Sequence, residues 1–200
     1  EDAAEALGSS YRGRSLGTFG AVATLSFNGN KIVTTGGGGA ILTQSETLAT
    51  RARHLTTTAK EPHPWAYRHD DIGYNYRMPN LNAALGLGQI QQLPELLERK
   101  RALYERYLQV FTNFQAGIIL KEPPGALSNC WLQNLVLEGD HASKRDAILQ
   151  ALNASGLQSR PVWDLLPHLS PFARYPSEPL CEAAQIMRRI ISLPSGPALS

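Results

Sequence analysis

A long amphipathic helix is predicted over residues 94–111, and it divides the chain into two parts. Pro94 suits the first position of a helix, where its missing N–H needs no partner. Apolar side chains recur at helical spacing along the segment: Leu96, Leu97, Leu103, Tyr104, Tyr107, Leu108 and Phe111. We therefore expect an α/β portion over residues 1–95 and a smaller α+β domain over residues 96–200, joined by this helix.

The α/β portion alternates short strands with helices. A short helix is predicted over residues 2–8, a buried strand over 19–27, and two β-rich pieces over 32–34 and 40–43 on either side of Gly36–Gly39. Ser45 is expected to cap a helix running to about residue 55. Residues 56–78 form a long connection, and connections of this length inside a domain are usually functional.

Composition excludes several classes of partner. Lys and Arg number 19 against 17 Asp and Glu, and this net charge of +2 is too small to indicate nucleic acid or an acidic membrane. The histidines lack metal-ligand spacing, so we assign no metal. The two cysteines, Cys130 and Cys181, form no CxxC pair, and a cytoplasmic location is expected.

The first residue is Glu1, and the two methionines, Met78 and Met187, lie far inside the chain. The opening EDAAEALG also has no strand before it. We therefore expect the chain to be the C-terminal half of a longer protein.

Lys31 is the first candidate for chemistry. It lies between a predicted buried strand and a glycine run, in SFNGNKIVTTGGGG. A lysine partly shielded from water loses its proton more readily, and its neutral amine can attack a carbonyl carbon. The alternative is a surface lysine in a polar turn, which is the commoner use of this residue.

Three further features fit one cofactor. Asp2 offers a carboxylate, Ser26 offers a hydroxyl at a strand end, and Gly36–Gly39 could bring backbone N–H groups near a phosphate. Pyridoxal phosphate (PLP) needs an amine for its Schiff base, an anion beside its pyridinium nitrogen and donors for its phosphate. Each feature is weak alone, since a helix N-terminus could satisfy Asp2 and a tight turn could explain the glycines.

Three segments resemble successive signatures of the DegT/DnrJ/StrS sugar aminotransferases: EDAAEALGSSYRG, SFNGNKIVTTGGGG and GYNYRMPNLNAALGLGQI. They occur in the family's order and spacing, and the resemblance covers the whole chain. It implies the C-terminal part of a fold type I PLP-binding large domain plus the small domain. The stretches SNCWLQNLVL, SRPVWDLLPHL and SLPSG resemble the branch that acts on UDP-linked 4-keto-6-deoxy-N-acetylhexosamines, as in legionaminic acid synthesis.

The resemblance implies roles for the matching residues. Lys31 matches the lysine that holds PLP as a Schiff base and later moves a proton at the substrate carbon. Asp2 matches the aspartate paired with the pyridine nitrogen, and Ser26 matches the serine on the PLP phosphate. Asn75 matches the asparagine that a neighbouring subunit supplies to that phosphate, so a homodimer is expected.

Other assignments are less direct. Arg77 lies in the same loop as Asn75 and is expected to meet phosphates of the cofactor or sugar nucleotide. Glu5 falls where the family often has Gln or His near the cofactor ring. Four residues are candidates for the substrate pocket, with core packing as the alternative: Asn129, Trp131, Arg160 and Trp163.

The expected activity is transfer of an amino group from an amino acid, glutamate being the expected donor, to the 4-keto carbon of a nucleotide-linked deoxysugar. A dehydratase of the same family would carry His in place of Lys31. A PLP-binding regulatory protein, which would form the Schiff base without turnover, remains as an alternative. An inactive truncated remnant is another, because the resemblance implies that the family's N-terminal half supplies a helix N-terminus for the phosphate and an aromatic ring that stacks on the cofactor.

Overall fold

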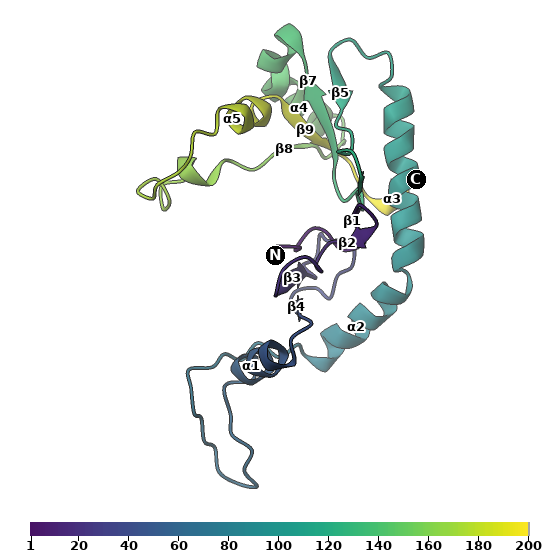
Figure 1. Cartoon of the computed structure of the whole chain (residues 1–200). Helices are drawn as coiled ribbons and strands as arrows, with labels where there is room; N and C mark the ends of the chain where they lie inside the picture. Colours follow the sequence, from purple (N-terminus) through teal and green to yellow (C-terminus); the bar gives the residue numbers. More distant parts are fainter. Residues whose placement is uncertain (200) are drawn as a thin grey trace. The chain divides into compact units, whose positions relative to one another are not determined.

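The computed structural model describes residues 1–199, and its contacts divide the chain into two units (Figure 1). Unit 1 comprises residues 1–98 and 123–131, whereas unit 2 comprises residues 99–122 and the chain from 132 onward. The division falls within helix α3, Leu93–Val110. Residues 123–131, which the sequence pattern places beyond the boundary, make their contacts with unit 1.

Unit 1 contains two small sheets. Strands β1 (Ser10–Tyr11), β2 (Arg14–Ser15) and β6 (Ala126–Leu127) form an antiparallel sheet in the order β2-β1-β6. Strands β3 (Ala23–Ser26) and β4 (Gly39–Leu42) form an antiparallel pair. A Cβ atom on Gly39 would lie 2.2 Å from the carbonyl oxygen of Leu25, so the close approach of these strands requires glycine.

The helix predicted over residues 2–8 is wrong. This segment forms turns, because its backbone pairs with β3: Ala3 N–H donates to the Thr24 carbonyl over 3.0 Å, and Asp2 and Thr24 form a parallel bridge. The strand predicted over residues 32–34 is also not formed. Those residues lie in a loop whose base is closed by Phe27, which bonds to Gly38 and Thr35 through its backbone.

Three helices belong wholly or partly to unit 1. Helix α1 (Glu46–Thr56) begins after Ser45, whose hydroxyl accepts a hydrogen bond from Leu48 N–H over 3.3 Å, so the predicted cap is confirmed. Helix α2 (Asn80–Gln91) follows Pro79 and is succeeded by α3. Between α1 and α2, residues 57–79 form the long connection expected over residues 56–78, and it contains isolated bridges at Thr57–Asn75 and Lys60–His69.

Unit 2 is built on an antiparallel sheet in the order β5-β7-β9-β8. Its strands are β5 (Gly117–Ile119), β7 (Gln133–Leu137), β9 (Ile190–Leu193) and β8 (Arg160–Pro161). Helices α4 (Arg145–Ala154) and α5 (Cys181–Met187) and short 3-10 helices at 139–144, 166–168 and 197–199 complete the unit. Leu137 and Ile191 are fully buried at its centre. Across residues 1–199, no helix is long and apolar enough to cross a membrane.

Candidate active site

Lys31 lies in the loop that joins β3 to β4. Its backbone N–H donates to the Asn28 carbonyl over 3.0 Å, which closes a turn. The Nζ atom donates to Oε1 of Glu5 over 2.8 Å and lies 4.0 Å from the centroid of the Trp131 ring. The Lys31 side chain is 14% exposed, so the shielding expected of this lysine is present.

Five of the residues singled out in the sequence surround one narrow cavity. Glu5, Ser26, Lys31 and Asn129 all line it, together with Trp131. Ser26 is the last residue of β3, and its hydroxyl accepts a hydrogen bond from Asn28 N–H over 3.3 Å. The site therefore combines four segments of unit 1: the N-terminal residues 4–7, the end of β3, the lysine loop (residues 27–38 between β3 and β4) and the returning segment (residues 129–131).

Asp2 lies on the N-terminal segment beside β3. Its Oδ1 accepts a hydrogen bond from Ala4 N–H over 3.1 Å in a turn, and its side chain is otherwise exposed. The helix N-terminus considered as its partner is not formed. Asp2 forms a backbone bridge with Thr24, which lies two residues before Ser26 in β3. The Asp2 carboxylate and the Ser26 hydroxyl therefore come from neighbouring, paired segments.

Glu1 is a residue that sequence reasoning left without a role. Its carboxylate accepts hydrogen bonds from the backbone N–H groups of Gly17 (2.7 Å), Phe19 (2.8 Å) and Gly20 (3.2 Å). The Gly17 N–H is the main cause that lowers the pKa of Glu1 below its usual value. Glu1 thus fixes the Gly17–Gly20 loop next to Asp2, and nothing in the sequence pattern signals this contact.

Asn129 is buried, and its amide is used inside unit 1. Nδ2 donates to the carbonyl oxygens of Glu5 (2.8 Å) and Leu7 (2.9 Å), and Oδ1 accepts from Trp131 N–H (3.0 Å). Its own N–H donates to the Ser9 hydroxyl over 2.9 Å. Asn129, predicted for the substrate pocket, therefore ties the N-terminal segment to the returning segment.

Asn75 and Arg77 lie at a different cavity of unit 1. This open cavity has a volume of about 1010 Å³ and is lined by the glycine run Gly37–Gly39, α1 residues and the segment 75–79. The glycine run and these two predicted phosphate ligands are therefore brought together. Lys31 does not line this cavity.

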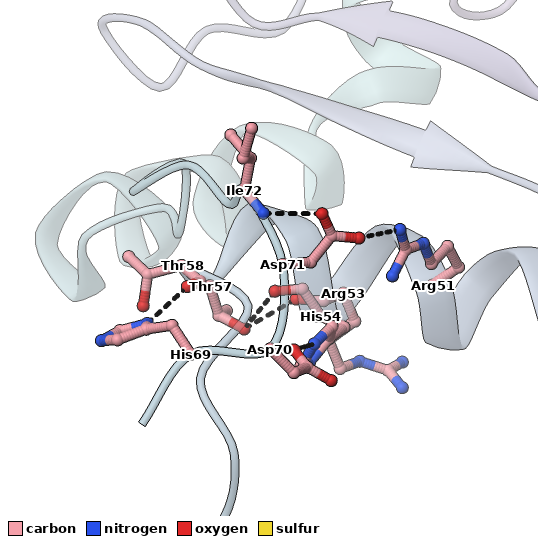
Figure 2. Close-up of polar contacts among 9 residues, drawn as sticks. All are labelled: Arg51, Arg53, His54, Thr57, Thr58, His69, Asp70, Asp71 and Ile72. Carbon is pink, nitrogen blue, oxygen red and sulfur yellow. Dashed lines mark hydrogen bonds and ion pairs between the residues drawn. The ribbon is translucent and has the colours of Figure 1, made fainter. Parts of the chain in front are cut away.

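Polar contacts fasten the connection that carries Asn75 to helix α1 (Figure 2). Arg51 forms an ion pair with Asp71, and this contact is the main cause that lowers the pKa of Asp71. His54 Nε2 lies 2.5 Å from Asp70 Oδ1. Asp71 also accepts a hydrogen bond from Ile72 N–H over 2.6 Å, so it joins the helix to the backbone of the connection.

Arg160 and Trp163 belong to unit 2. Arg160 is in β8 and Trp163 follows it, and both side chains are exposed. Their place in a substrate pocket stays a prediction.

The donor set of unit 1 fits PLP. A shielded primary amine, a carboxylate with an exposed edge and a strand-end hydroxyl are the groups that bind the aldehyde, ring nitrogen and phosphate of this cofactor. Among residues 1–199, no group of three or more His, Cys, Asp or Glu side chains could hold a metal ion.

Named relatives act on sugars. The chain is 36% identical over 202 residues to the GDP-perosamine synthase of Escherichia coli O157:H7, covering 100% of this chain and 53% of that protein. It is 32% identical over 212 residues to dTDP-4-dehydro-2,3,6-trideoxy-D-glucose 4-aminotransferase of Saccharopolyspora spinosa, covering 100% and 54%. The chain thus spans about half the length of these relatives.

The fold has solved counterparts. Spr1654 from Streptococcus pneumoniae, solved in a PLP form, matches with a TM-score of 0.87 and 26% identity, covering 100% of this chain and 53% of that chain. The predicted mixed α/β architecture, forming part of a sugar aminotransferase fold, is confirmed. The sequence model of the DegT/DnrJ/EryC1/StrS aminotransferase family matches residues 1–200, and the chain belongs to that family.

Proposed function

We propose that this chain acts as part of a PLP-dependent aminotransferase. The activity is transfer of an amino group from an amino acid, with glutamate as the expected donor, to the 4-keto carbon of a nucleotide-linked deoxysugar. The observation that carries the proposal is the placement of Lys31, whose amine is shielded beside Glu5 and lies in a cavity shared with Ser26.

Each residue has a defined task in this reaction. PLP supplies an electron sink that makes a proton on the amino-bearing carbon removable. Lys31 binds the cofactor through Nζ and moves the proton at the substrate carbon. Asp2 keeps the ring nitrogen protonated through its carboxylate, and Ser26 donates its hydroxyl to the phosphate.

The location of Asn75 supports a homodimer. Asn75 and Arg77 line a cavity that Lys31 does not line, which fits a loop that completes the site of a neighbouring subunit. The same connection exposes large aromatic side chains, with Trp65 and Tyr67 each 83% exposed, and such surfaces commonly mark contacts with another protein.

The substrate is proposed as a class. The two named relatives act on sugars linked to GDP and dTDP, whereas the stretches SNCWLQNLVL, SRPVWDLLPHL and SLPSG resemble a UDP-specific branch. A sugar linked to a nucleoside diphosphate is common to these, and Arg77 is the proposed cationic partner of its diphosphate.

The experiment compares UDP-, GDP- and dTDP-linked 4-keto-6-deoxysugars as acceptors, with ¹⁵N-glutamate as donor and mass spectrometry of the sugar as readout. We expect ¹⁵N in an aminosugar with the unaltered protein and none with Lys31→Ala. Label incorporation in the Lys31→Ala protein would overturn the assignment.

A mixed dimer tests the role of Asn75. Lys31→Ala and Asn75→Ala proteins are each expected to be impaired, but their mixture should regain activity, because one site of the mixed dimer has an intact Lys31 and an intact Asn75. If each impaired protein stays impaired after mixing and exchange of subunits, Asn75 does not act across a dimer.

A further inference from the structure

We propose that Trp131 and Glu5 are positioning residues that hold the Lys31 amine at one point of the site, and that Asn129 holds both of them there. The inference rests on the proposed function in one respect, which is that Lys31 is the reactive amine. It goes beyond that function by assigning the placement of the amine to residues that need not touch the sugar.

Trp131 presents a ring face to the lysine. The Lys31 Nζ lies 4.0 Å from the ring centroid, which is within the range of a cation–π interaction. The orientation of the ring is fixed at its other edge, because Nε1 donates a hydrogen bond to the Asn30 carbonyl over 2.6 Å. Asn30 immediately precedes Lys31, so the indole is fastened to the same turn that carries the amine.

Glu5 supplies the second contact. Its Oε1 lies 2.8 Å from Nζ, and its side chain is 51% exposed, so part of the carboxylate stays in water. Among the residues that line this cavity, Glu5 and Lys31 are the two with titratable side chains. A substitution that removes the charge of Glu5 therefore acts on the Lys31 amine directly, through this ion pair.

Asn129 sets the distance between these two partners. Its Nδ2 bonds to the Glu5 carbonyl and its Oδ1 bonds to Trp131 N–H, so one buried amide links both backbones. Asn129 is 6% exposed, and loss of its side chain would leave the Glu5 and Leu7 carbonyls without their donor.

Fixing the amine matters because lysine has a flexible four-carbon side chain. An amine that must meet one carbonyl carbon gains rate when its position is set before the reactant arrives. Trp131, Glu5 and Asn129 together supply that preorganisation, and they do so from segments far from Lys31 in the sequence.

Nuclear magnetic resonance of the full chain, with lysine labelled by ¹³C at Cε, tests the placement without cofactor. A lysine whose end lies over an indole face has its Cε proton signals displaced upfield by the ring current. We expect a displaced Lys31 signal that Trp131→Leu returns to the position of an exposed lysine and Trp131→Phe partly retains. Glu5→Gln should reduce the displacement, because the amine loses its second anchor.

Lys60 provides a matched control in the same molecule. Its Nζ lies 4.3 Å from the centroid of the Tyr67 ring, so its signal should also be displaced. Tyr67→Leu should abolish that displacement and leave Lys31 unchanged, whereas Trp131→Leu should do the reverse. Asn129→Ala should return the Lys31 signal toward the exposed position, and if that variant does not fold, the Trp131 and Glu5 variants decide the matter.

An undisplaced Lys31 signal in the unaltered chain, or one that Trp131→Leu does not move, would overturn the proposal. Failure of the proposed function looks different. In that case the Lys31 signal is displaced as expected, but PLP followed by borohydride does not attach to Lys31.

Discussion

Gly86 of helix α2 lies directly against Thr35 at the end of the loop that carries Lys31. A Cβ atom on Gly86 would come within 2.6 Å of Thr35 Cγ2, and Thr35 is 1% exposed. Asn82 of the same helix donates a hydrogen bond from Nδ2 to the Thr35 carbonyl. The close contact of Gly86 and the hydrogen bond of Asn82 therefore hold α2 against Thr35 in the lysine loop.

Replacement of Gly86 by Ala should destabilise the chain by about 1–3 kcal/mol, because the added methyl group overpacks a buried contact. A Cβ atom on Gly88 in the same helix would meet no atom within 4 Å, so Gly88→Ala should stabilise by about 0.5–1 kcal/mol through helix propensity. Urea unfolding of both variants measures the difference. Equal changes in the free energy of unfolding for the two substitutions would show that Gly86 is not in tight contact with Thr35.

The three hydrogen bonds to Glu1 predict a pH-dependent contribution to stability. Because they lower the folded pKa below the unfolded value of about 4.3, the contribution is present above that pH and is lost as pH falls through the folded pKa. Glu1→Gln should therefore lower stability at neutral pH, and the difference from the unaltered chain should shrink in acid. Glu105→Gln, at an exposed position of α3, is the control and should change little. A Glu1→Gln difference that does not vary with pH would contradict the account.

Asp71 should hold residues 57–79 to helix α1. Asp71→Asn removes the charge that pairs with Arg51, so backbone hydrogen exchange in the connection should speed up, including at Tyr74, whose N–H donates to the Leu55 carbonyl. The Arg51 contact lowers the pKa of Asp71, so the anchor is present above the unfolded value of about 3.9 and is lost as pH falls below the folded pKa. High salt should weaken the anchor because both side chains are partly exposed.

Asp164→Asn, an exposed position of unit 2, is the control for that experiment and should leave exchange in residues 57–79 unchanged. The Asp71 account is wrong if the connection exchanges at the same rate in the Asp71→Asn chain as in the unaltered chain.

Local signals predicted much of unit 1. The cap at Ser45 and the long connection follow from the chemistry of single residues and need no partner far along the chain. The segment 2–8 shows where such reasoning fails. Its alanines favour a helix, but pairing with β3 takes up the backbone of Ala3 instead.

The surroundings of Lys31 needed long-range information. The order of the motifs indicates Lys31 and Asp2 as site residues. No local sequence pattern predicts that the Trp131 ring lies against the Lys31 amine or that the Asn129 amide donates to the Glu5 carbonyl. Residues 129–131 lie outside any strand, because β7 begins only at Gln133. The hydrophobic pattern of a single sequence gives the periodicity of a segment, but it does not show which other segment that one packs against.

The central claim is that Lys31 is the residue that binds PLP covalently. The direct measurement is incubation with PLP, reduction with borohydride and mass spectrometry of the peptides, on this chain and on a protein extended upstream of Glu1. We predict that the cofactor is attached to Lys31 in the extended protein, with weaker labelling of the 200-residue chain, and that Lys31→Ala abolishes it. Attachment to another lysine, or labelling that persists in Lys31→Ala, would contradict the account.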